Sequence, residues 1–131
     1  MNTKILMTTS AIVLGLIGII LTFMPKEIIN VYYVDGIGLM KIVVQLIGAL
    51  YIAFAMLNWM SKSALIGGIY NRPLVVANTT HFTIGGLALL KGITTLPVIP
   101  NPILALMLIY LVFGITFGML LFRHPSPQKN V

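Results

Sequence analysis

The chain has 131 residues, of which 59% are hydrophobic and only 8% are charged, and its mean hydropathy is +1.06. A soluble domain carries about 25% charged residues, so this composition excludes a protein that faces water on all sides. The absence of cysteine excludes disulfides, thiolate metal ligands and thiol nucleophiles. Basic residues outnumber acidic ones by 8 to 2. Because they flank apolar runs, we expect them to meet anionic lipid headgroups and not nucleic acid.

Four uncharged runs have the length of membrane spans, namely Ile5–Met24, Ile42–Ser61, Pro73–Leu90 and Pro102–Phe122. A helix needs about 20 residues to cross a hydrocarbon core of about 30 Å. The sequence therefore predicts an all-α integral membrane protein, an antiparallel four-helix bundle that forms a single transmembrane domain over residues 1–131. Spans are expected at about 4–24, 41–60, 73–91 and 102–122, with a polar cytoplasmic tail at 123–131.

The distribution of lysine and arginine predicts the orientation, because cytoplasmic loops carry an excess of these residues. With the N-terminus inside, the cytoplasmic side holds Lys4, Lys62, Arg72, Arg123 and Lys129, and the outer side holds Lys26, Lys41 and Lys91. We expect the first run to be retained as a span, since no small-residue cleavage pattern precedes Lys26. The predicted protein is therefore a multi-pass protein of the bacterial inner membrane with both termini in the cytoplasm.

Small residues form one stripe along the first span, namely Thr8, Ala11, Gly15, Gly18 and Thr22. Since small residues let helix backbones approach closely in lipid, the stripe predicts a packing face. On the second span, one face holds Gln45, Gly48, Ala49, Ile52, Met56 and Trp59. In the loop between these spans, residues 25–40, the stretch Lys26–Tyr33 is expected to lie flat in the headgroup region. After the second span, Ser63–Tyr70 is expected to form a short interfacial turn of helix.

The fourth span carries a GxxxG pattern at Gly114 and Gly118. This pattern predicts a close helix crossing, either within the bundle or between two copies of the chain. The predicted partners are the lipid bilayer and either a membrane partner subunit or a homodimer formed through Gly114 and Gly118.

The third span is the least apolar, and it carries His81, an ionisable residue at membrane depth. His81 lies 8 residues from Pro73, about 12 Å into the core at about 1.5 Å per residue. One helical face, within about 60° of His81, holds Asn78, His81, Gly85 and Ala88. Ionisable residues at this depth are costly, which makes them functional candidates.

Matching heights across antiparallel spans predicts one hydrogen-bonded band near His81. The candidate ligand-binding residues are His81, Asn78, Tyr51, Ser10, Thr116 and Gln45. Two interpretations stay open. The histidine either ties helices together, at about 0.6 kcal/mol for an average interhelical hydrogen bond, or contacts a ligand or substrate.

Several kinds of site are excluded by the residues present. A proton-coupled pump needs an intramembrane carboxylate, whereas Glu27 and Asp35 lie in a loop. Haem ligation by two histidines needs a second one at the depth of His81, and His124 lies at the membrane boundary. Zinc needs three or four clustered ligands, and a serine triad needs an acid. The sequence assigns no catalytic residue, metal site or particular cofactor, so enzymatic chemistry would be limited to acid–base work by one histidine.

Three stretches carry a resemblance to a known group of proteins. They are the run from Gln45 to Trp59 (QLIGALYIAFAMLNW), the NRP motif at 71–73 and the HFxxGGL motif at 81–87. Together they resemble the DoxX-like proteins, small four-span bacterial membrane proteins, over nearly the whole chain. The resemblance implies the four-span layout, and it implies an association with redox complexes or quinone-linked enzymes, as in some members. It carries over no functional residue.

The leading functional hypothesis is a non-catalytic membrane protein that binds a small apolar ligand, such as a lipid or a quinone, or a partner subunit, through the face of Asn78 and His81. The alternatives are a component of an oligomeric transporter or channel and, third, a membrane enzyme that uses His81.

Overall fold

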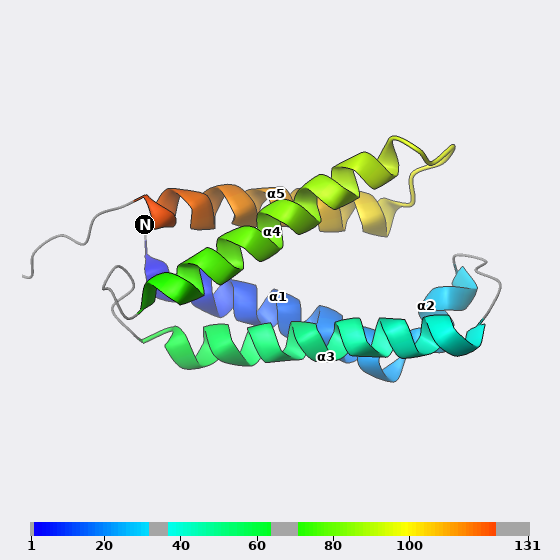
Figure 1. The fold of residues 1–131 in the computed structure, drawn as a ribbon, viewed down its shortest axis with the longest axis horizontal. Helices are drawn as coiled ribbons and strands as arrows, with labels where there is room; N and C mark the ends of the chain where they lie inside the picture. The colour runs from blue at the N-terminus through cyan, green and yellow to red at the C-terminus, as the bar shows by residue number, and fades with distance from the viewer. Residues whose placement is uncertain (1, 32–36, 64–70, 123–131) are drawn as a thin grey trace, which may run out of the picture. The chain divides into compact units, whose positions relative to one another are not determined.

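The computed structural model describes residues 2–31, 37–63 and 71–122. Helix accounts for 89% of these residues and no strand occurs among them, which confirms the all-α prediction. Four helices are long and apolar enough to cross a membrane, as expected of a multi-pass membrane protein (Figure 1). They are α1 (Thr3–Phe23), α3 (Ile37–Ser61), α4 (Arg72–Ile93) and α5 (Asn101–Leu121).

The segment after α1 is more helical than the sequence predicts. A short helix, α2 (Pro25–Val31), follows α1 directly, and α3 starts at Ile37, before the predicted start of the second span. Proline suits the first turn of α2 because its missing N–H has no intrahelical partner there. The N–H of Ile28 donates to the carbonyl of Met24 at 3.3 Å, so the backbone resumes helical bonding at once. Most of the predicted turn at Ser63–Tyr70 and the whole tail at 123–131 lie outside the described residues.

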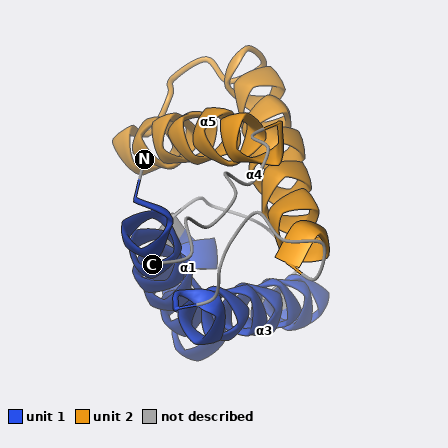
Figure 2. Cartoon of the chain, turned by 90° about the vertical axis from the view of Figure 1, so that its left-hand side faces the viewer, with its two compact units in different colours: residues 1–63 blue, residues 64–131 orange. Residues whose placement is uncertain are grey.

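The helices form two compact units, unit 1 (residues 1–63) and unit 2 (residues 64–131), coloured separately in Figure 2. In unit 1, α1 and α3 are antiparallel, since Ser10 meets Asn58 while Gly18 meets Gly48. In unit 2, α4 and α5 are antiparallel as well. There Thr79 faces Gly118, and Gly86 faces Leu111.

The small-residue stripe of α1 packs against α3, which confirms its predicted role. A Cβ atom added to Gly18 would lie 2.9 Å from the carbonyl oxygen of Gly48. A Cβ atom added to Gly48 would lie 2.7 Å from the backbone nitrogen of Thr22. Real Cβ atoms do not approach backbone this closely, so both glycines are needed where the two helices touch backbone to backbone. Close approach of this kind replaces the hydrophobic effect, which does not drive helix association within lipid.

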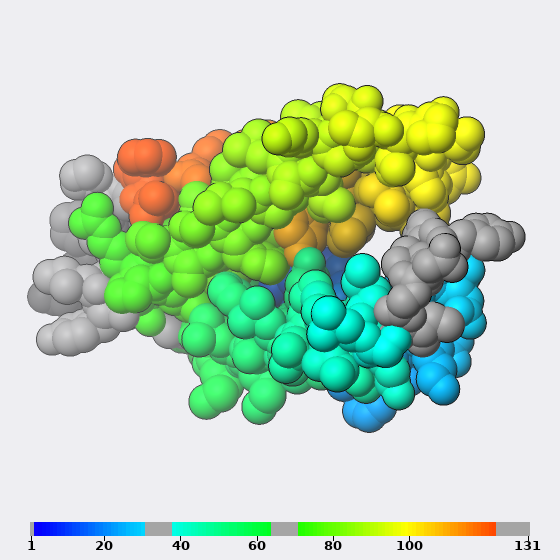
Figure 3. All heavy atoms as spheres, turned by 45° about the vertical axis from the view of Figure 1, so that its right-hand side comes forward, coloured from blue at the N-terminus to red at the C-terminus, as the bar shows by residue number. Residues whose placement is uncertain are grey.

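The surface of α3 away from α1 is apolar and exposed. Leu46 is 66% exposed and Leu50 is 53% exposed, and atoms of α3, cyan to green, lie on the face that the space-filling view shows (Figure 3). Such a surface suits contact with lipid tails, because the tails are as apolar as the side chains.

Unit 2 packs through aromatic rings. Phe82 of α4 stacks on Phe113 and Phe117 of α5, with ring centroids 4.8 and 5.6 Å apart. Phe82 and Phe117 are fully buried. The side of α4 that meets α5 therefore includes Phe82.

The GxxxG glycines of α5 lie at this same crossing. A Cβ atom added to Gly114 would lie 3.3 Å from the hydroxyl oxygen of Thr83, and one added to Gly118 would lie 4.0 Å from the methyl carbon of Thr79. The crossing within one chain, one of the two predicted uses of the pattern, is therefore present. Homodimerisation through Gly114 and Gly118 stays a prediction.

Candidate functional site

His81 of α4 is paired with Tyr110 of α5. Its Nε2 atom lies 3.0 Å from the Tyr110 hydroxyl oxygen, which is a hydrogen bond whose donor is set by the histidine tautomer. The Tyr110 side chain is only 1% exposed, while His81 is half-buried. The buried phenol therefore fixes the orientation of an imidazole ring that keeps part of its surface accessible.

The rings of His81 and Tyr110 pack against each other and against the ring of Phe82. The centroid of the His81 ring lies 5.1 Å from that of Phe82 and 5.4 Å from that of Tyr110. Phe82 and Tyr110 meet edge to face at 5.2 Å, a favoured aromatic geometry. We call these three residues, together with Phe113 and Phe117, the aromatic cluster. In this cluster the hydrogen-bonded pair of His81 and Tyr110 lies at the edge of the packed phenylalanine rings.

Gly85 makes room for the phenol. A Cβ atom at this position would lie 2.5 Å from Cε1 of Tyr110, so any side chain there would displace the ring. Gly85 stands one turn after His81 on the same helical face. The HFxxGGL motif thus supplies both the imidazole and the gap that brings its partner within hydrogen-bonding distance.

Asn78 lies one turn before His81 on the same face, as the sequence predicts, and it is fully buried. Its Nδ2 atom donates to the carbonyl oxygen of Leu74 at 3.0 Å. This bond within α4 holds the amide against its own helix.

Ser10 belongs to a separate polar contact in unit 1. Its hydroxyl oxygen accepts a hydrogen bond from Nδ2 of Asn58 at 3.1 Å and donates to the carbonyl of Met7 at 3.0 Å. Ser10 and Asn58 are both fully buried. The contact therefore ties α1 to α3 within the apolar interior.

Gln45 and Thr116 each bond to a backbone carbonyl. Nε2 of Gln45 donates to the carbonyl of Thr22 at 3.2 Å, at the end of α1. The Thr116 hydroxyl donates to the carbonyl of Val112 at 2.6 Å, within its own helix. Thr116 also lies about 120° around α5 from Tyr110, so the two residues present different faces. The Gln45 bond therefore ties α3 to α1, whereas the Thr116 bond stays within α5.

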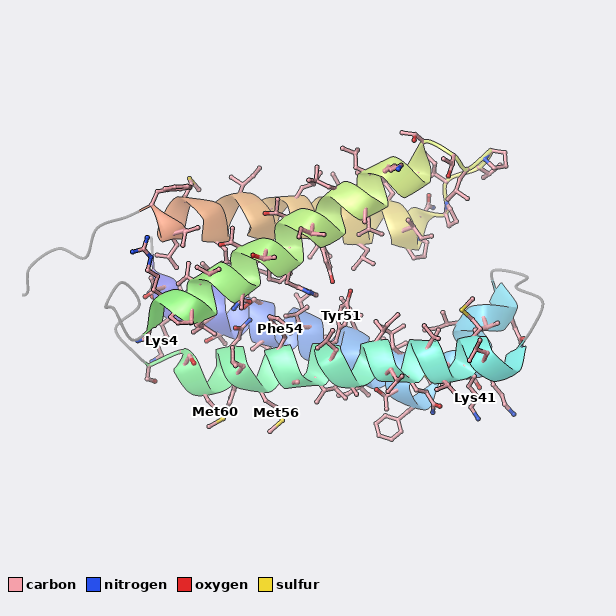
Figure 4. The ribbon with its side chains drawn as sticks, viewed as in Figure 1. Lys4, Lys41, Tyr51, Phe54, Met56 and Met60 are labelled. Carbon is pink, nitrogen blue, oxygen red and sulfur yellow. The ribbon has the colours of Figure 1, made fainter. Side chains whose placement is uncertain are left out.

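Tyr51 projects from the side of α3 opposite Met56 and Met60 (Figure 4). The predicted band would combine Tyr51 and Ser10 of unit 1 with residues of unit 2, and it stays a prediction. Within unit 2 the structure brings His81 and Asn78 together on α4, and it adds Tyr110.

Two polar residues of these contacts are missing from the predicted set, Tyr110 and Asn58. Matching heights within one hairpin does not find Tyr110. The register that sets Thr79 against Gly118 and Gly86 against Leu111 puts His81 level with residue 116, as predicted, whereas Tyr110 lies more than one turn further from that level and reaches His81 with its long side chain. Asn58 follows from the same matching against Ser10, but its neighbour Trp59 favours an interfacial position instead.

Among the described residues, no three His, Asp or Glu side chains gather closely enough to hold a metal ion. The site brings together one imidazole and one phenol, which exchange a hydrogen bond with each other. Comparisons of the chain with protein-family models, curated proteins and solved structures find no match.

Proposed function

We propose that the chain is a non-catalytic protein of the bacterial inner membrane that binds a small apolar molecule, such as a quinone or a lipid, at the α4 face of Asn78 and His81. In this proposal its four long helices form an antiparallel bundle with both termini in the cytoplasm. The length and apolarity of those helices support insertion, and the excess of lysine and arginine on one side supports the orientation.

The observation that carries the proposal is the bond between His81 and Tyr110. A polar pair at membrane depth is costly unless it is satisfied or used. Here one partner is buried and the other is half-buried. A purely structural tie would be served by burying both rings, whereas a ring that is oriented on one side and accessible on the other suits ligand contact.

The surroundings of the pair favour a flat ligand with a polar edge. The half-buried imidazole of His81, backed by the buried rings of Phe82 and Tyr110, is the aromatic group of this face that a planar ligand ring can reach. A carbonyl oxygen of the ligand could then accept a hydrogen bond from the imidazole. A quinone combines both features, and the DoxX-like resemblance supports the same ligand class.

The proposal is tested with His81→Ala and Tyr110→Phe in purified protein, with decylubiquinone as the probe. Equilibrium dialysis measures its binding, and mass spectrometry measures the quinone or lipid that co-purifies. We expect His81→Ala to abolish retention while the elution volume and helical content stay unchanged. Tyr110→Phe should weaken binding by up to about tenfold, because it removes only the group that orients the imidazole.

Thr116→Val serves as the control, since it removes a hydroxyl from another face of the neighbouring helix. Unchanged binding in this variant is expected. Equal loss in Thr116→Val would overturn the local site and support the wider band predicted from the sequence. Aggregation of His81→Ala and Tyr110→Phe alike in detergent would overturn the ligand role and show that the pair is a structural tie.

A further inference from the structure

Unit 1 carries an open groove of about 280 Å³ along the α1/α3 hairpin. Its walls are Ala11, Gly15 and Ile19 of α1 with Ile52, Ala55 and Trp59 of α3. Met56 and Met60 form the outer lip on α3, and Met60 is 79% exposed. Every lining side chain is apolar or aromatic. The small residues that bring the two helices together also hollow out this surface.

The groove begins at the Lys62 end of the hairpin and extends past the middle of α1. Its walls cover Ala11–Ile19 on α1 and Ile52–Met60 on α3, about 12 Å on each helix at about 1.5 Å per residue, and the two stretches are staggered because Gly18 meets Gly48. One leaflet is about 15 Å deep, half of a hydrocarbon core of about 30 Å. A single fatty-acyl chain that starts on the Lys62 side and lies parallel to the helices would therefore meet groove walls over the depth of its leaflet.

A fixed positive charge stands at the mouth of the groove. The Nζ atom of Lys62 lies 3.1 Å from the centroid of the Trp59 ring, a cation–π contact. Trp59 also lines the groove, so one indole ring serves as wall and as a support for the ammonium group. Lys4 lies at the same end of the hairpin, because the antiparallel register that pairs Ser10 with Asn58 sets Lys4 within two residues of the level of Lys62.

We propose that this groove binds one acyl chain of an anionic phospholipid, whose phosphate is paired by Lys62 at the groove mouth. The proposal rests on the membrane location proposed above, but on none of the residues of the His81 site.

Charge selects the lipid in this arrangement. Lipid tails are as apolar as the walls of the groove, so burial of a tail gives no preference over bulk lipid. The headgroup must provide the preference. A lysine near the membrane surface attracts anionic lipid by an amount that corresponds to about a fivefold change in affinity. A phosphatidylglycerol should therefore be preferred over a phosphatidylcholine with identical tails.

The single tryptophan of the chain gives a direct test. Protein is reconstituted in bilayers of dioleoyl-phosphatidylcholine that contain a small fraction of a chain-brominated lipid, either phosphatidylglycerol or phosphatidylcholine. Bromine quenches the indole only at contact. We expect brominated phosphatidylglycerol to quench Trp59 more strongly than brominated phosphatidylcholine at the same mole fraction, each signal being normalised to the same protein in unbrominated lipid.

Two variants separate the headgroup contact from the groove itself. Lys62→Gln should abolish the preference for the anionic lipid, a change of about fivefold. Lys41→Gln, the same change near the opposite end of α3 (Figure 4), should leave the preference intact. Gly15→Leu should fill the groove and reduce quenching by the anionic lipid. Its first side-chain carbon would lie 3.6 Å from the Cβ of Ala55, an ordinary contact that the hairpin can accept.

Equal quenching by the two brominated lipids in the unaltered protein would overturn the proposal, as would equal losses in Lys62→Gln and Lys41→Gln. A stable dimer whose indole neither brominated lipid reaches would show instead that a second copy covers the groove. His81→Ala should leave the preference unchanged, so this test can fail while the quinone test succeeds. Lys62 lies after the last residue of α3. The comparison of Lys62→Gln with Lys41→Gln therefore tests the proposal even if Gly15→Leu does not fold.

Discussion

The α1/α3 hairpin and the α4/α5 hairpin use different contacts to hold two apolar helices together. In the first, the backbones touch at Gly18 and Gly48. In the second, Phe82 fills the space against Phe113 and Phe117. Both hairpins add polar bonds between their helices, from Asn58 to Ser10 and from Gln45 to the carbonyl of Thr22 in unit 1, and between His81 and Tyr110 in unit 2.

The difference lies in what the small and the large residues each permit. Glycines that meet face to face allow close approach but leave hollows beside them, and in unit 1 such a hollow is the groove. Aromatic rings fill the helix interface and leave polar groups at its margin. The unit with the fully buried polar bond carries an apolar surface groove, while the unit with the half-buried polar bond presents its imidazole at the edge of the interface.

The largest expected effect is on the aromatic side of this comparison. Phe82→Ala should lower the free energy of unfolding by about 3 kcal/mol, because it leaves a cavity among three stacked rings. Titration with a denaturing detergent, followed by circular dichroism, measures it. Phe122→Ala is the control, since Phe122 is 82% exposed. Similar losses in both variants would mean that the cluster does not hold α4 to α5.

Gly48→Ala should have the second-largest effect. It should lower the free energy of unfolding by about 2 kcal/mol, because the added methyl group overpacks against the backbone of α1. Gly38→Ala is the matched control on the same helix, because a Cβ atom there meets nothing within 4 Å. It should be neutral or stabilising by up to about 1 kcal/mol, from better helix propensity. The same detergent titration compares the two. If Gly48→Ala is tolerated as well as Gly38→Ala, unit 1 does not depend on backbone contact.

Ser10→Ala should cost about 1 kcal/mol, because it deprives the buried Asn58 amide of its hydroxyl partner. Thr9→Ala provides the comparison. The Thr9 hydroxyl is exposed and bonds only carbonyls of its own helix, those of Ile5 and Leu6, among the described contacts. Removal of this hydroxyl should change the free energy of unfolding by no more than the experimental error. A larger loss for Thr9→Ala than for Ser10→Ala would contradict the role of the polar tie.

Tyr110→Phe should have the smallest effect on stability, about 0.6 kcal/mol, the average for an interhelical hydrogen bond in a bilayer. The ring stays in the aromatic cluster, while the hydroxyl and its bond to His81 are lost. A loss of several kcal/mol would show that the pair stabilises unit 2 more than the rings do. Combined with the binding assay, this measurement separates a structural role from a ligand role.

Much of the architecture could be predicted from the sequence because apolar length and small-residue spacing are local properties. The stripe from Thr8 to Thr22 indicates its own packing face without knowledge of the partner. The backbone carbonyl contacts were equally local. The hydroxyl of Thr79 bonds the carbonyl of Val75, as expected for a threonine inside an apolar helix.

The candidate site was only partly predictable, because which side of a helix meets its neighbour depends on the neighbour. His81 and Asn78 indicate a polar face of α4, but α5 also packs against the side of Phe82 and Gly86. His81 therefore lies at the margin of the interface and reaches Tyr110 across it. The gap at Gly85 that admits Tyr110 becomes meaningful only once α5 is in place.

The meeting of Gly15 with Ala55 has a practical consequence. A Cβ atom on Gly15 would lie 3.6 Å from that of Ala55, within the range of about 3.5–4.5 Å that a disulfide spans. The chain has no cysteine of its own, so the double substitution Gly15→Cys and Ala55→Cys would introduce one pair of thiols with no competitor. Oxidation would then lock the first hairpin covalently, and reduction would release it.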